Sequence, residues 1–157
     1  MKWRLISECE PLSGFENMAR DEAILKHVED GESPPTIRLY RWSPSCLSLG
    51  KHQNPEVELN SAAIKRDQIH FVKRYTGGRM VYHAEELTYS VIAPVKVASW
   101  GLTLQKTYNE ISTWLLACLS QFGEDFSIEK GDLVVKGQKS QVAQACFAST
   151  AKSEVVL

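Results

Sequence analysis

The chain has 157 residues, 43% of them hydrophobic and 24% charged, which is the composition of one soluble globular domain with its own core. A formal net charge of −1 gives no overall positive field to attract nucleic acid or an anionic membrane, so any basic site must be local. No apolar run is long enough to cross a bilayer, and the first residues lack the apolar core of a signal peptide. These features exclude a non-specific nucleic-acid-binding protein and indicate a cytoplasmic one.

The cysteine spacing gives no sign of a metal site or a disulfide framework. Cys9, Cys46, Cys118 and Cys146 lie far apart, and no two of them form a C-x-x-C pair. All four side chains are therefore expected to be reduced thiols, and no bound metal is expected.

Hydrophobic periods divide the first half of the chain into short elements. Strands are expected at residues 3–6, 36–42, 46–50 and from 69 to the basic pair at 73–74, and helices at about 15–28 and 60–66. In the first helix, Glu22 lies four residues after Met18 and three before Leu25. Its carboxylate is therefore expected to face the apolar stripe and to hold backbone N–H groups or a basic residue.

The second half continues the alternation of strands and helices. Strands are expected at residues 79–83, 87–92, 133–137 and 154–157, and the longest apolar stripe predicts a helix at 105–122 that Gly123 ends. Cys118 lies in the middle of that stripe and is expected to belong to the core.

The candidate chemistry lies in a turn between two of these strands. Gly77 and Gly78 leave bare backbone N–H groups that can approach a ligand closely. Arg74 and Arg79 on either side favour an anionic or carbonyl-bearing group. The alternative interpretation is an ordinary hairpin turn with an exposed basic rim.

The wider pattern resembles the signature of the lipoate-protein ligase A and octanoyltransferase family, most closely that of the cysteine-dependent octanoyltransferases. The resemblance implies an α+β fold with a mixed, largely antiparallel central sheet flanked by helices, like the catalytic domain of biotin/lipoate protein ligases. A single domain of this type is expected over residues 1–157, incomplete at its C-terminus. The implied acyl- or adenylate-binding residues are Arg74, Thr76, Gly77, Gly78, Arg79, Met80, Val81, Tyr82 and His83.

Cys146 is the candidate nucleophile. It lies in the small and polar stretch Gln144–Ala148, with no helical stripe to explain it, and the alternative is an ordinary buried or surface cysteine. The Cys146–Phe147 pair resembles the element whose cysteine carries the acyl-thioester intermediate in cysteine-dependent octanoyltransferases. Such a thiol needs a nearby cation or base to form the reactive thiolate.

The activating lysine is less clearly marked. The family's K-x-x-G-x-A motif, roughly fifteen residues beyond the cysteine, has no counterpart before Leu157. One alignment makes Lys139 the acyl-site lysine, and another leaves Lys139 or Lys152 as a substitute in a rearranged site. His83 is either a general base for the incoming lysine amine or a neutral imidazole packed at a strand end.

Three functions remain open at this point. The resemblance favours an acyltransferase that moves an octanoyl or lipoyl group from octanoyl-acyl carrier protein to a lysine of a lipoyl domain, without a cofactor. The recipients would be the lipoyl domains of 2-oxoacid dehydrogenases or the glycine cleavage carrier protein. The alternatives are a lipoate-protein ligase that uses lipoate, ATP and Mg²⁺, and a truncated module that binds the acyl group or a carrier without turnover.

Overall fold

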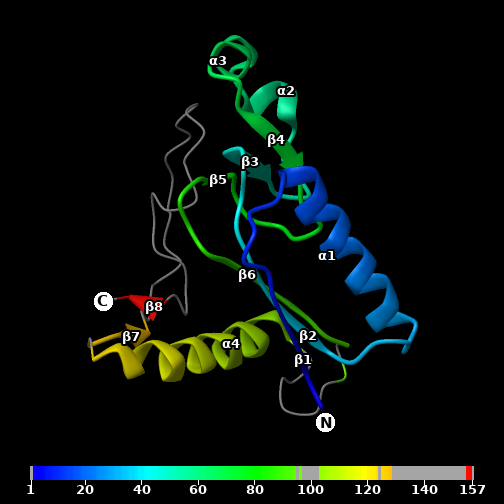
Figure 1. The fold of residues 1–157 in the computed structure, drawn as a ribbon, viewed down its shortest axis with the longest axis vertical. Helices are drawn as coiled ribbons and strands as arrows, with labels where there is room; N and C mark the ends of the chain where they lie inside the picture. Colours follow the sequence, from blue (N-terminus) through cyan, green and yellow to red (C-terminus); the bar gives the residue numbers. More distant parts are fainter. Residues whose placement is uncertain (1, 95, 97–102, 124, 129–154, 157) are drawn as a thin grey trace. The chain divides into compact units, whose positions relative to one another are not determined.

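The computed structural model describes residues 2–94, 96, 103–123, 125–128 and 155–156 (Figure 1). These residues fall into two compact units, one up to Pro94 and the other from Lys96 onward. In the described part of the chain, no helix is both long and apolar enough to cross a membrane. The predicted single catalytic domain over residues 1–157 stays a prediction.

The first unit contains two three-stranded sheets, each with one parallel and one antiparallel pairing. One sheet has the order β1 (Arg4–Ser7), β2 (Thr36–Tyr40), β6 (Thr88–Ile92). The other has the order β4 (His70–Lys73), β3 (Cys46–Leu49), β5 (Val81–His83). All six strands lie where the sequence predicts them, and the expected α+β class is confirmed.

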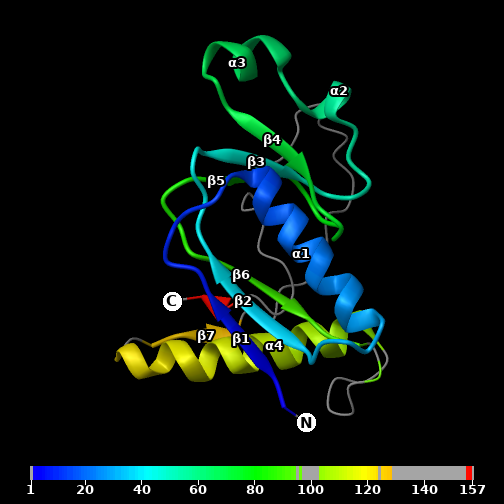
Figure 2. The same cartoon turned by 45° about the vertical axis from the view of Figure 1, so that its right-hand side comes forward.

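Helix α1 (Gly14–Glu29) packs against strands of both sheets (Figure 2). Ser13 starts it with a capping box, in which the Ser13 hydroxyl accepts from the Glu16 amide while the Glu16 carboxylate accepts from the Ser13 backbone N–H. Its first residue, Gly14, is a glycine for a packing reason, since a Cβ there would lie 2.4 Å from Cys46 Sγ. The helix therefore sits against the small core of unit 1, formed by Tyr40, Trp42, Cys46 and Val72 with Met18 beside it.

The buried ion pairs of unit 1 correct the expectation for Glu22. Glu22 is exposed, and its Oε1 accepts a hydrogen bond from the Tyr75 hydroxyl. The preceding residue, Asp21, faces the sheet and accepts from Arg38 Nη1 at 2.9 Å, from Tyr40 and from Ser90. One residue along a helix is a rotation of about 100°, which is enough to exchange the inward and outward carboxylates.

Arg38 is the centre of this cluster and is completely buried. Its guanidinium donates to Glu8, to Asp21, and to the backbone and side-chain oxygens of Asn17. A buried arginine is tolerated only when its donors have such acceptors. These bonds tie α1 to the sheet of β1, β2 and β6.

The remaining elements are short, with the exception of one helix. Unit 1 also contains α2 (Pro55–Glu58) and α3 (Ser61–Arg66). Unit 2 contains α4 (Leu104–Leu119), η1 (Ser120–Phe122), and the antiparallel pair β7 (Ser127–Ile128) and β8 (Val155–Val156).

The predicted helix is confirmed as α4, but Cys118 is exposed, so its assignment to the core is wrong. The one buried residue of α4 in the described part of the chain is Ser112.

Candidate functional site

The glycine loop, residues Arg74–Arg79, connects β4 to β5 and is organised from inside by Arg74. The Arg74 Nη2 group donates to the carbonyl oxygens of Gly77 at 2.9 Å and Arg79 at 2.6 Å. Its Nη1 group donates to Ser48 O at 2.7 Å, and its Nε to Thr76 Oγ1 at 3.2 Å. The guanidinium therefore shapes the loop by binding its carbonyl groups.

A second segment, just after β3, lies directly against the glycine loop. The backbone N–H of Lys51 donates to Thr76 O at 2.9 Å, and that of Arg74 donates to Leu49 O at 2.9 Å. Gly50 approaches so closely that a Cβ on it would lie 2.1 Å from the carbonyl oxygen of Gly78. The site thus depends on Gly50, which the sequence analysis did not include among the site residues, although its position at the end of a strand was visible.

The two glycines of the loop have different reasons to be glycine. Gly78 has φ +91°, a left-handed conformation, and a Cβ there would lie 3.0 Å from Arg74 Nη2. Gly77 has no positive φ, and within the described residues nothing lies within 4 Å of a Cβ placed on it. The backbone N–H groups of Gly77 and Gly78 have no hydrogen-bond partner in that part of the chain. The described fold therefore explains Gly78 but not Gly77.

The predicted site residues from Arg79 to His83 differ in burial. Arg79, Met80 and Val81 are partly buried and Tyr82 is exposed, whereas His83 is only 7% exposed. The nine predicted acyl- or adenylate-binding residues thus lie in the glycine loop, in β5 and at Met80 between them, and their binding role stays a prediction.

His83 is enclosed by protein groups on both ring nitrogens. Its Nε2 lies 2.7 Å from Ser48 Oγ, its Nδ1 lies 2.5 Å from Glu86 Oε1, and its ring stacks on Trp42 at 4.0 Å. Burial lowers the pKa of His83 below its usual value, although Glu86 acts in the opposite direction. A neutral imidazole that occupies both nitrogens is a poor candidate for a base that must reach a substrate.

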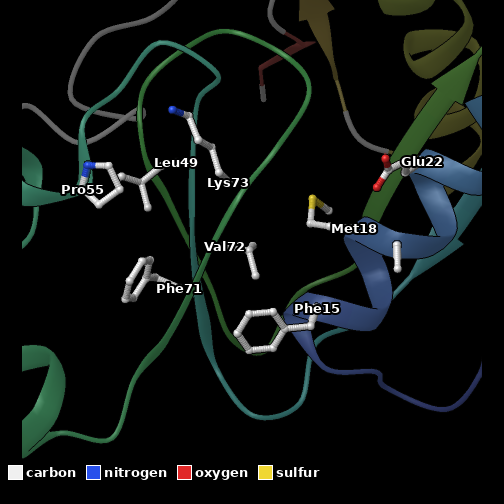
Figure 3. Close-up of a pocket in the computed structure, with 9 residues that line it drawn as sticks. Phe15, Met18, Glu22, Leu49, Pro55, Phe71, Val72 and Lys73 are labelled. Atoms are coloured by element: carbon white, nitrogen blue, oxygen red, sulfur yellow. The ribbon is translucent and has the colours of Figure 1, made fainter.

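An apolar pocket of about 330 Å³ lies at the base of the glycine loop. It is lined by Leu49 and Lys73, the residues immediately before Gly50 and Arg74, and by side chains of α1. Figure 3 shows Phe15 and Met18 projecting from α1 toward the strand that carries Val72. The other lining residues are Ala19, Glu22, Pro55, Phe71 and Val72. The charged Glu22 and Lys73 are exposed, whereas Leu49 and Val72 are buried.

Comparison with known proteins identifies the family of the chain. The family model for the lipoyl protein ligase A/B catalytic domain matches residues 13–146. The chain belongs to this family. It is 37% identical to the octanoyltransferase LipM of Geobacillus kaustophilus over 99% of its own length, and 36% identical to that of Bacillus subtilis over a similar share.

Solved structures agree with the family assignment. The structure of a lipoate-protein ligase A bound with ATP covers 91% of the chain and 55% of its own length, with a TM-score of 0.71 and 26% identity. A structure from the analysis of a bi-partite lipoate protein ligase and its E2 lipoyl domain from Thermoplasma acidophilum covers 83% of the chain and 49% of its own length, with a TM-score of 0.68 and 25% identity. The chain spans about half the length of the curated relatives it matches, 56% for both LipM proteins.

Two predicted residues of this lipoyl protein ligase A/B catalytic domain, Cys146 and Lys139, lie outside the described residues. Their roles stay predictions. The described part adds two residues that were not predicted from the sequence: Ser48, which joins His83 to Arg74 of the glycine loop, and Glu86, which binds the other ring nitrogen of His83. The only sequence signal for Glu86 was its spacing of three residues from His83, and Ser48 gave none beyond its place in a strand.

Proposed function

We propose that the chain is part of an acyltransferase that moves an octanoyl, or lipoyl, group from a carrier thioester to a lysine of a lipoyl domain. The resemblance to proteins named octanoyltransferase LipM supports this proposal, since it extends over 99% of the chain. The glycine loop and its neighbouring pocket would supply a place for the head and the tail of such a group.

The observation that carries the proposal is the glycine loop itself. Arg74 takes up the carbonyl oxygens of Gly77 and Arg79, so the loop's acceptors face inward to the protein. The N–H groups of Gly77 and Gly78 remain as exposed donors without a partner among the described residues. Exposed donors of this kind suit a carbonyl oxygen that gains negative charge during acyl transfer. The absence of a side chain at Gly77 then serves the ligand, because the described fold does not require it.

The pocket suits the acyl tail. Its volume of about 330 Å³ is at the lower end of the roughly 300–1,000 Å³ found for small-molecule sites. At about 0.8 kcal/mol per buried CH₂, burial of a seven-carbon tail would contribute on the order of 5 kcal/mol to binding. A tail between α1 and β4 would lead toward the glycine loop, because two lining residues of the pocket are next to the site in the sequence. Leu49 directly precedes Gly50, and Lys73 directly precedes Arg74, the first residue of the loop.

In the proposed reaction, the Cys146 thiolate attacks the carbonyl carbon of the carrier thioester. The carbon–sulfur bond to the carrier breaks, the carrier leaves as a thiol after taking up a proton, and Cys146 holds the acyl group as a thioester. The neutral amine of the target lysine then attacks this thioester, forms the amide, and passes its proton to the departing Cys146 thiolate. Lys139 is the proposed residue that lowers the pKa of Cys146 and handles these protons.

Intact-mass measurement after mixing the chain with octanoyl-acyl carrier protein tests the proposal. An adduct of one octanoyl group on the wild-type chain, absent from Cys146→Ser, is the expected result. An adduct of equal yield in Cys146→Ser would exclude the thioester mechanism. Binding of octanoate without any adduct in the wild-type chain would instead indicate a module that holds the acyl group without turnover.

A second candidate is a lipoate-protein ligase, favoured by the similarity to a ligase A solved with ATP. The exposed glycine N–H groups and the flanking Arg79 are of the chemical type that holds phosphate. ATP with Mg²⁺ would supply activation of lipoate as an adenylate. Pyrophosphate release that needs lipoate and ATP, and that is unchanged in Cys146→Ser, would favour the ligase over the transferase.

A further inference from the structure

A continuous chain of hydrogen bonds runs through the interior of unit 1 and ends at the arginine that shapes the glycine loop. Three of its members are almost completely buried, with Trp42 5%, Ser48 2% and His83 7% exposed. The links are Trp42 Nε1 to Thr88 Oγ1 at 2.7 Å, Thr88 Oγ1 to Glu86 Oε1 at 2.6 Å, Glu86 Oε1 to His83 Nδ1 at 2.5 Å, His83 Nε2 to Ser48 Oγ at 2.7 Å, and Ser48 Oγ to Arg74 Nη1 at 3.1 Å.

Four of the five bond directions in this chain follow from groups that can only donate or only accept, namely Trp42, Arg74 and an ionised Glu86. The Trp42 indole N–H can only donate, so Thr88 Oγ1 accepts from it, and the Thr88 hydroxyl donates its own hydrogen bond to Glu86. The Arg74 guanidinium can also only donate, so Ser48 Oγ accepts from it. The bonds that start from Trp42 and those that start from Arg74 meet at the Glu86 carboxylate, which can only accept when it is ionised.

The state of His83 follows from these directions. In the neutral ring that burial favours, Nδ1 carries the proton and donates to Glu86, so Nε2 accepts the hydroxyl proton of Ser48. With that proton placed, Ser48 Oγ offers a lone pair to Arg74 Nη1, and Arg74 Nη2 reaches the carbonyl oxygens of Gly77 and Arg79. The tautomer of one buried histidine is therefore linked through two side chains to the shape of the glycine loop.

We infer that His83 and Glu86 are positioning residues, which hold the Ser48 hydroxyl and the Arg74 guanidinium so that the glycine loop keeps its ligand-binding shape. The inference deepens the proposed function and rests on it only in giving the loop a ligand. Neither residue is placed to react with substrate. Ser48, His83 and Glu86 do have the order of a nucleophile, a base and an acid, but a serine that is 2% exposed cannot receive an acyl group.

NMR on the 157-residue chain measures both the tautomer of His83 and the hydrogen exchange of amides that hold the glycine loop. Long-range ¹H–¹⁵N spectra of wild type should show His83 as the neutral Nδ1–H tautomer at pH 7. Hydrogen exchange should be measured at the Lys51 and Arg74 amides, whose bonds to Thr76 O and Leu49 O hold the two segments of the site together. In Ser48→Ala, which cuts the chain next to Arg74, exchange at both amides should rise about tenfold or more.

Two variants separate positioning from general destabilisation. Glu86→Met removes the acceptor on which the donors end, and should shift His83 toward the Nε2–H tautomer and speed Lys51 exchange. Thr88→Val is the matched control, since it cuts the chain beyond Glu86 with little change of shape, and should leave the His83 tautomer and the Lys51 exchange rate within about twofold of wild type.

Three results would overturn the inference: an Nε2–H tautomer in wild type, unchanged Lys51 exchange in Ser48→Ala, or equal acceleration in Ser48→Ala and Thr88→Val. None of these measurements requires transfer activity. If the wild-type chain forms no octanoyl adduct while the tautomer and exchange results hold, the proposed function fails and the positioning role stands.

Discussion

A methyl group added at Gly50 or at Gly77 should have opposite effects on stability, although both glycines belong to the same site. At Gly50 the new Cβ would lie 2.1 Å from the Gly78 carbonyl oxygen, and ordinary contact begins at 3.4 Å. The loop or the Gly50 segment must therefore move by roughly 1.3 Å, a backbone shift that no side-chain rotation can replace. At Gly77 the described residues leave the space around the new Cβ empty.

The magnitudes follow from the bonds at stake. Overpacking of a tight contact costs about 1–3 kcal/mol, and the shift also weakens the bond from Lys51 N–H to Thr76 O, with a net value of about 1 kcal/mol. Gly50→Ala should therefore cost about 3 kcal/mol and lower Tm by roughly 6–12 °C. Gly77→Ala should be neutral or stabilise by up to about 1 kcal/mol, because alanine restricts the unfolded chain and fits the native backbone.

The assay combines thermal unfolding with the rate of octanoyl adduct formation. Gly77→Ala should keep the wild-type Tm and yet lose about tenfold or more in rate, because its methyl group occupies the space where a carbonyl would meet the loop. Gly50→Ala should lose both. If the Tm of Gly77→Ala is several degrees below that of wild type, the space around the added methyl group is not empty. If it transfers at the wild-type rate, the bare amide of Gly77 has no part in binding.

The remaining predictions concern the interior of unit 1. Arg38→Met should cost about 3–5 kcal/mol, because it leaves the Asp21 carboxylate with no cation in a largely buried setting, and a thermal-unfolding Tm within about 2 °C of wild type would contradict this. Burial lowers the pKa of His83 below 6.5, so the unfolded chain binds more protons than the native one below that pH. Stability should thus fall as pH drops through 6.5, and less steeply in His83→Gln, as measured by urea unfolding. Burial raises the pKa of Cys46 to about 11, so iodoacetamide at pH 8 should modify the exposed Cys9 and leave Cys46 intact in peptide mass maps.

Local structure was the part of this fold that the sequence could predict. The first helix, expected at 15–28, is Gly14–Glu29, and the strand expected from 69 is His70–Lys73. These elements have strong local signals, since hydrophobic periods mark their length. The strand expected at 79–83 is shorter in the structure, where β5 is Val81–His83.

Orientation was the part that it could not predict. A helical stripe indicates which side is apolar, but the choice between Asp21 and Glu22 depended on where Arg38 lies, some 17 residues later in the chain. For Cys118 the apolar stripe predicted burial of a side chain that is exposed, whereas the buried residue of α4 is Ser112. The error at Glu22 arises because the partner surface comes from a distant segment that a local period does not describe.

Arg74 shows how the same limit affects the site. A basic residue beside a double glycine suggests a cation that meets an anionic ligand, yet the described bonds of this guanidinium run to Ser48, Thr76, Gly77 and Arg79. A lysine at this position would keep the charge but not the planar set of donors that reaches several acceptors at once. Arg74→Lys should therefore impair the loop as an alanine would, whereas a residue whose charge meets the ligand would tolerate that exchange. Comparison of Lys51 amide exchange in Arg74→Lys and Arg74→Ala decides between these two roles.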